Sequence, residues 1–125
     1  MFAVTFYGYL KPDQISAAEE MGMRMYEAVQ EAPGFIELQR AKIDPLTELS
    51  IVYFDTEENV RSWYNDPRHR QVMKAGREHV LRDYRIEVCE VKRAYNMQTS
   101  TYDARIAAET CSRTPLQSSG SDARS

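Results

Sequence analysis

A chain of 125 residues forms one domain at most, large enough to bury a core but small enough to gain stability from oligomerisation. The 16 basic and 19 acidic residues give a formal charge of −3, and the scattered basic residues exclude a basic surface for a nucleic acid partner. No run approaches the roughly 18 apolar residues that cross a bilayer, and the apolar start lacks a basic leader and a cleavage site. We therefore expect a cytoplasmic protein with no membrane partner.

The first predicted elements are a strand and a helix. Residues Phe2–Leu10 are apolar or aromatic at both parities, which is typical of a central strand covered on both sides. Residues 13–31 place apolar side chains three and four apart, which predicts an amphipathic helix that ends at Pro33 and Gly34.

Two further strands and two helices follow. Residues Phe35–Asp44 and 47–55 are predicted strands, and the short turn between them predicts an antiparallel hairpin. Asp55 is a predicted helix cap, and this helix runs to about residue 65. Asp66 followed by Pro67 predicts the start of a second helix, because proline loses no hydrogen bond at the first helical position.

The last predicted strand covers residues 83–95. Its apolar set changes phase after Val88, which predicts either a bulge near that residue or an apolar environment on both faces. Cys89 falls in this strand and Cys111 in the polar segment beyond it. Two cysteines so far apart argue against a disulfide framework and against a thiolate metal site.

The order of these elements predicts an α+β fold, the ferredoxin-like split βαβ pattern with a four-stranded antiparallel sheet and helices on one face. By parity, the other face also carries apolar or aromatic side chains. Leaving that face in water would forgo roughly 10 kcal/mol, so we expect a second copy to cover it in a two-fold homodimer. The side chains assigned to this face are Tyr7, Tyr9, Ile36, Leu38, Val52 and Phe54.

Composition changes after residue 96. Residues 97–125 are rich in serine and threonine and poor in large aliphatic side chains, so they cannot bury enough apolar surface to form a core. We expect a domain at 1–96 and a largely disordered tail at 97–125. A short amphipathic piece at 102–110 could dock as a helix on the partner subunit.

The residues that follow the hairpin resemble a known family. The runs 53–69, 76–78 and 84–88 are similar to the antibiotic biosynthesis monooxygenase domain of the dimeric α+β barrel superfamily, and the resemblance covers about 1–96. It implies a dimeric α+β barrel. Superfamily relatives include cofactor-free oxygenases, heme-degrading enzymes and proteins with no established activity, so the resemblance does not select one reaction.

In cofactor-free relatives, a small aromatic phenol or quinol is deprotonated between helices and sheet and then reduces dioxygen itself. The resemblance therefore implies no cofactor, and a cavity with a few polar groups that hold the anion. Asn59 and Trp63, four residues apart on one helical face, match pocket residues of such relatives. His69 is the candidate general base. The candidate substrate-binding residues are Tyr7 and, near the place where the resemblance implies a pocket arginine, Arg82 and Arg85, between which the residue count does not select.

Three alternatives stay open. Each candidate side chain could have a structural role instead, with Trp63 as a core or interface anchor. The protein could be a homodimer that binds a small ligand without catalysis. A heme-degrading enzyme would need an axial histidine where this chain has Met73 and an asparagine where it has Tyr7. His79 has no helical partner at the right spacing for a metal site.

Overall fold

The computed structural model describes residues 1–98. The expected tail helix at 102–110 and Cys111 lie outside the described residues. Residues Met1–Lys92 form one compact unit and Arg93 begins a second, so the unit described below is Met1–Lys92. The boundary predicted at residue 96 stays a prediction. Within the described part of the chain, no helix has the length and apolar character that a membrane crossing requires.

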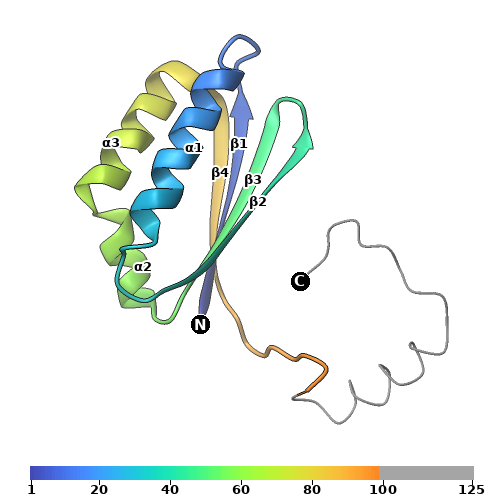
Figure 1. Ribbon diagram of the computed structural model, residues 1–125, viewed down its shortest axis with the longest axis vertical. Helices are drawn as coiled ribbons and strands as arrows, with labels where there is room; N and C mark the ends of the chain where they lie inside the picture. The colour runs from blue at the N-terminus through green and yellow to red at the C-terminus, as the bar shows by residue number, and fades with distance from the viewer. Residues whose placement is uncertain (99–125) are drawn as a thin grey trace, which may run out of the picture. The chain divides into compact units, whose positions relative to one another are not determined.

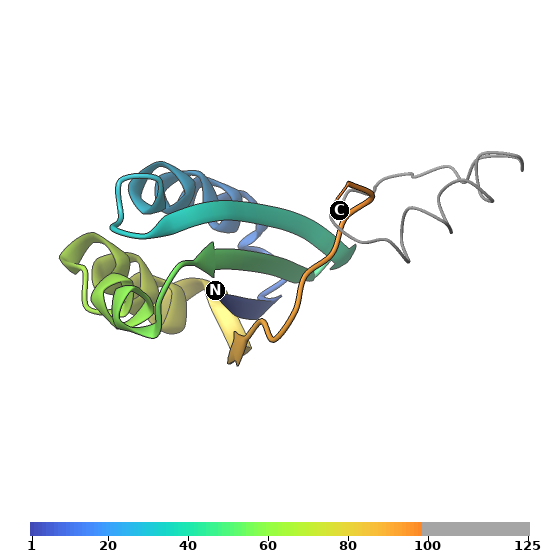
Figure 2. The ribbon, with the colours of Figure 1, turned by 90° about the horizontal axis from the view of Figure 1, so that it is seen from below.

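The compact unit has the predicted α+β architecture, with one helical layer on a four-stranded antiparallel sheet of order β2-β3-β1-β4 (Figures 1 and 2). The central position of β1 confirms the expectation from its two apolar faces. The elements in chain order are β1 Phe2–Leu10, α1 Ile15–Val29, β2 Phe35–Asp44, β3 Thr47–Phe54, α2 Glu57–Tyr64, α3 Pro67–Ala75, the π-helical η1 Gly76–Val80, and β4 Leu81–Glu90.

The strand register shows which side chains face the helices. Val4 of β1 pairs with Val52 of β3, and Val52 pairs with Leu38 of β2. Directly paired residues of antiparallel strands project to the same face, and all three side chains pack against the buried cluster beneath the helices. The core therefore lies between the helical layer and the even-numbered residues of β1.

This register corrects the parity assignment of three side chains. Leu38, Val52 and Phe54 were expected on the open face, but they lie on the helix-facing side, where Phe54 has no exposed surface. Both parities of β3 are apolar, so alternation could not identify its inner face. Ile36 is 48% exposed, and it lies where the β2–β3 register shifts.

The open face is instead formed by the odd-numbered residues of β1 and their partners. Tyr7 pairs with Leu49, Thr5 with Ile51, and Ala3 with Tyr53, so these side chains share the face that no helix of the compact unit covers (Figure 2). An aromatic and aliphatic surface thus exists on this side. Tyr7 and Tyr9 belong to it as parity predicted, and Leu49, Ile51 and Tyr53 lie there in place of side chains that face the helices.

Of the two alternatives predicted near Val88, the bulge is wrong. Val88 pairs regularly with Val4, and the register between β1 and β4 shifts only between Tyr9 and Leu10 of β1. The strand ends at Glu90, so the apparent phase change at Val91 falls beyond its end. The sequence pattern had joined a strand to the segment that follows it.

The helix starts are close to the predicted ones. Asp66 caps α3, where its carboxylate accepts a hydrogen bond from the Arg68 amide at 2.8 Å, and Pro67 is the first helical residue as expected. For α2 the cap is Thr56, whose hydroxyl accepts from the Asn59 amide at 3.1 Å, rather than the predicted Asp55. Either residue type can cap a helix, so the sequence alone left a one-residue ambiguity.

Candidate functional site

A cavity of about 230 Å³ lies between the helical layer and the sheet. Its floor comes from β1, β2, β3 and β4, and its roof from α1, α2, α3 and η1. Three methionines contribute to its walls, and their flexible side chains adapt to ligands of different shape. The lining includes Val4, Phe6, Met21, Met25, Val52, Val60, Trp63, His69, Met73, Tyr84 and Ile86.

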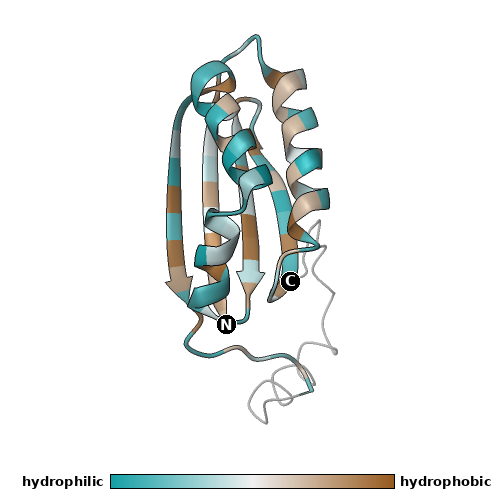
Figure 3. Cartoon of the chain, turned by 90° about the vertical axis from the view of Figure 1, so that its left-hand side faces the viewer, coloured by the Kyte–Doolittle hydropathy of each residue, from teal (hydrophilic) through white to brown (hydrophobic). Residues whose placement is uncertain are grey.

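The cavity opens toward β4 because the helical layer stops short of that strand. No helix overlies β4, which is the strand at the left edge of Figure 3. Its helix-facing side chains Tyr84, Ile86 and Val88 line the cavity and yet remain 38%, 37% and 50% exposed. A small apolar molecule therefore has access to the cavity along this edge.

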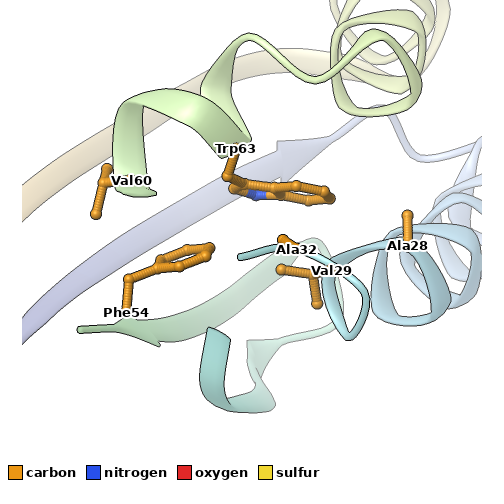
Figure 4. Packing of buried hydrophobic residues seen from close by; sticks show 6 residues of the cluster. All are labelled: Ala28, Val29, Ala32, Phe54, Val60 and Trp63. Atoms are coloured by element: carbon orange, nitrogen blue, oxygen red, sulfur yellow. The ribbon is translucent and has the colours of Figure 1, made fainter. Parts of the chain in front are cut away.

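Trp63 lies in the roof of the cavity, because it belongs to the face of α2 that packs toward the sheet. Val60 and Trp63, three residues apart, are each only 7% exposed, and both belong to the cluster that contains Phe54 of β3 and Val29 of α1 (Figure 4). The spacing of three places both side chains on the inner face of the helix. The indole thus has a packing role and also lines the cavity.

His69 lies against Trp63 because the cap at Asp66 turns the chain back at the start of α3. The imidazole stacks on the indole with ring centroids 4.4 Å apart and planes 12° apart. Its Nδ1 lies 2.9 Å from the backbone carbonyl oxygen of Trp63. Since a carbonyl can only accept, Nδ1 carries the proton and donates it, which leaves the lone pair of the neutral ring on Nε2.

Burial lowers the pKa of His69 below its ordinary value of 6.5, against the opposing effects of the Trp63 carbonyl and the Asp66 carboxylate. The imidazole is therefore neutral at neutral pH. No hydrogen bond joins Nε2 to any residue of the described chain. A neutral histidine with a fixed tautomer and an available Nε2 lone pair is suited to accept a proton from a bound ligand.

Asn59 does not line the cavity. Its side-chain amide donates to the carboxylate of Asp55 at 2.7 Å, and its Cβ lies where a side chain at Gly34 would project. Gly34 has a φ of 78°, a conformation that favours glycine. Although Asn59 is four residues before Trp63, its side chain is directed to this turn, where it supports the start of α2.

The three candidates for substrate binding also lie outside the cavity. Tyr7 and Arg85 are paired across β1 and β4 on the open face of the sheet, with the guanidinium carbon 4.0 Å from the tyrosine ring centroid. Arg82 donates from Nε to the Leu10 carbonyl at 3.1 Å. Of the six candidates, the structure brings only Trp63 and His69 together at the cavity.

Two arginines that the sequence reasoning missed line the cavity, Arg40 of β2 and Arg77 of η1. Arg40 follows Leu38 by two residues, so strand alternation could have placed both on the inner face. The position of Arg77 could not be predicted in this way, because a π-helical turn does not follow the residue spacing of an α-helix or a strand.

Within residues 1–98, no three histidine, cysteine, aspartate or glutamate side chains are grouped so that they could hold a metal ion. Met73 lines the cavity at the position where the heme-degrading alternative would need a histidine. That alternative stays a prediction.

No protein-family model and no curated protein matches the chain. Solved structures do. A provisionally assigned antibiotic biosynthesis monooxygenase from Deinococcus radiodurans is similar with a TM-score of 0.71 and 15% identity, over 77% of this chain and 97% of that one. A provisionally assigned antibiotic biosynthesis monooxygenase from Nitrosomonas europaea has a TM-score of 0.66 and 13% identity, over 74% of this chain and 100% of that one.

A third similar structure is a variant of SnoaB, a cofactor-independent oxygenase from Streptomyces nogalater. Its TM-score is 0.63 and its identity 14%, over 74% of this chain and 94% of that one. At such identities the similarity establishes the fold and leaves the reaction open. The resemblance read from the sequence is confirmed at this level: the chain has the fold of the antibiotic biosynthesis monooxygenase structures.

Proposed function

We propose that this chain is a cytoplasmic, cofactor-independent monooxygenase that acts on a small aromatic phenol or quinol in the cavity between helices and sheet. The observation that carries the proposal is His69, a neutral imidazole with Nδ1 bonded to a backbone carbonyl and Nε2 available at an apolar cavity. The cofactor-independent activity named for the SnoaB structure supports it.

The first step is a proton transfer. The phenolic hydroxyl of the substrate gives its proton to Nε2 of His69, and Nδ1 of the resulting imidazolium stays bonded to the Trp63 carbonyl. The apolar lining strengthens this ion pair because little water competes with it. Trp63 forms a flat wall against which an aromatic substrate can stack.

The second step consumes dioxygen. The electron-rich phenolate passes one electron to dioxygen, and the radical pair combines to form a carbon–oxygen bond. The peroxide takes the proton back from His69. Loss of the ring C–H proton then breaks the O–O bond, so that one oxygen atom stays on the carbon as a quinone carbonyl and the other leaves as water. The substrate supplies all the electrons.

The test is oxygen uptake by the purified protein with a panel of naphthols and hydroquinones. We expect uptake that depends on the protein, one labelled atom from isotopic dioxygen in the product, and a slower reaction in Trp63→Phe. The isotope separates oxygenation from oxidation that releases hydrogen peroxide. Uptake equal to the protein-free rate with every substrate would retire the proposal and favour the non-catalytic ligand-binding alternative.

We also propose that the protein is a homodimer formed through the open face of the sheet. That face carries Tyr7, Tyr9, Leu49, Ile51 and Tyr53, and no helix of the compact unit covers it. Contiguous apolar surfaces of this kind mark interfaces, and a two-fold contact lets one surface cover another copy of itself.

Ile51→Glu is expected to shift the protein to monomers, because it places two carboxylates in a buried two-fold contact. Sedimentation velocity at micromolar concentration measures the change. Met23→Glu is the matched control, since Met23 is 62% exposed on α1 and its replacement should leave the dimer intact. A monomeric wild type, or a dimer in Ile51→Glu, would contradict this interface.

A further inference from the structure

The arginines of the compact unit divide into two groups by their partners. Most are engaged by a carboxylate, a carbonyl, an amide or an aromatic ring. Arg40 and Arg77 have no hydrogen bond or ion pair to any of the residues 1–98, and they are the two that line the cavity. The engaged arginines are Arg24, Arg61, Arg68, Arg70, Arg82 and Arg85.

The exposed side chain of Arg40 approaches α1 closely at the wall of the cavity. Its guanidinium lies against Gly22, and a Cβ at that position would come within 2.8 Å of the guanidinium carbon and still closer to Nη2. Any larger residue at 22 would displace the arginine head group. The glycine thus permits a close approach that places an unpartnered cation against the helix at the cavity wall.

The residues around Arg40 indicate which kind of ligand could bind beside its charge. Across the sheet, Arg40 is in register with Ser50, Phe6 and Ile86, and all four line the cavity. The floor therefore changes from a cation on β2 to apolar side chains on β1 and β4, which lie two and three strands away in the sheet. A ligand that fits this floor has a flat apolar body and a negative group at one end.

The charges of the lining favour an anion. The lining contains Arg40 and Arg77 against one acid, Glu48, although the whole chain has more acidic than basic residues. Glu48 lies on β3 two residues before Ser50, and its carboxylate there would favour a cationic ligand instead. A guanidinium presents two parallel N–H donors, which match the two oxygens of a carboxylate.

We propose that Arg40, held against Gly22, binds the carboxylate of an aromatic acid whose rings occupy the apolar part of the cavity. The inference rests on the proposed function for the identity of the cavity as the substrate site, and it narrows the substrate class from phenols in general to phenols that also carry a carboxylate. It assigns Arg40 a specificity role separate from the proton transfer at His69.

The test compares three probes with the same ring system, namely 2-naphthoate, neutral 2-naphthamide and cationic 2-naphthylmethylammonium. Binding is followed by the indole N–H resonance of Trp63, the single tryptophan of the chain, which lines the cavity. Wild type is expected to bind naphthoate about tenfold more tightly than the amide, and the ammonium most weakly.

Two variants probe Arg40 in different ways. Arg40→Met removes the charge and should lower naphthoate affinity about tenfold or more, with little change for the amide. Gly22→Ala keeps the charge but displaces the guanidinium, so it should also weaken naphthoate, while the amide reports any loss of cavity volume. Arg24→Met is the matched control, because Arg24 pairs with Glu20 on the exposed side of α1 and makes the same charge change.

Any of four results would overturn the inference. In wild type these are equal affinities for naphthoate and the amide, tighter binding of the ammonium, or no shift of the indole resonance with any probe. In Arg40→Met it is an unchanged affinity for naphthoate. Failure of the inference is distinct from failure of the proposed function. If the protein prefers naphthoate but takes up no oxygen, only the proposed catalysis is contradicted. If oxygen uptake is the same in wild type and Arg40→Met with every substrate, only the carboxylate site is contradicted.

Discussion

His69→Ala is expected to lower kcat for oxygen uptake by about 10²–10⁴-fold, the usual contribution of a positioned general base. The lining contains no second imidazole, and its other titratable side chains are Glu48, the two tyrosines Tyr64 and Tyr84, and the two arginines. The rate in the variant is measured at saturating substrate, and the unfolding curve of the same sample shows that the fold persists.

The pH profile gives this prediction a second readout. A base must be unprotonated to act, so kcat/KM is present above the pKa of His69 and is lost as the pH falls through it. Since burial lowers that pKa, the loss should occur below pH 6.5. The acidic limb should disappear in His69→Ala, and added imidazole should restore part of the rate.

The chain provides its own control for this experiment. His79 lies on η1 with a side chain that is 73% exposed, and it does not line the cavity. His79→Ala should leave both the rate and the pH profile unchanged. Equal losses in the two variants would show that the effect comes from histidine removal in general, and an unchanged rate in His69→Ala would remove the general base from the mechanism.

Phe54→Ala is expected to lower the free energy of unfolding by about 3–5 kcal/mol, a large part of the total for a domain of this size. Phe54 has no exposed surface and packs in the cluster with Val60 and Trp63 above it. Its ring also meets the edge of Phe35 at a centroid distance of 6.4 Å. Truncation leaves a cavity that these side chains cannot fill without moving α2.

Urea unfolding at a fixed protein concentration measures this loss, because a dimer gains stability with concentration. Ile43→Ala is the control, since Ile43 is 54% exposed and its truncation should change stability by less than about 0.5 kcal/mol. If Phe54→Ala cost no more than the control, the packing of Phe54 in the buried cluster would not contribute to stability as expected.

The fold could be predicted because its local signals agree with one another. Asp66 and Pro67 predict the start of α3, because aspartate caps helices and proline is favoured at the first helical position. The short connection at Pro45 predicts an antiparallel hairpin between β2 and β3. The alternation of apolar and polar residues did not identify the inner face of a strand whose two faces are both apolar. In β3, Leu49, Ile51 and Tyr53 are as apolar as Val52 and Phe54, so only the register to β1 identifies the inner face.

The site could be predicted in part. Trp63 and His69 were candidates from the resemblance, and both line the cavity. Arg85 was misplaced relative to the cavity because one residue of strand parity separates the inner face from the open one. Arg40 was missed because Leu38, which shares its parity, was assigned to the open face, and its contact with a glycine eighteen positions earlier leaves no local pattern.

The acceptor that orients His69 is a peptide carbonyl of α2 and belongs to no side chain. The side chain at residue 63 can therefore change without loss of the backbone hydrogen bond that keeps the lone pair of His69 on Nε2. In the proposed mechanism, substitutions at residue 63 can reshape the aromatic wall for other substrates while the backbone carbonyl keeps the tautomer of His69 unchanged.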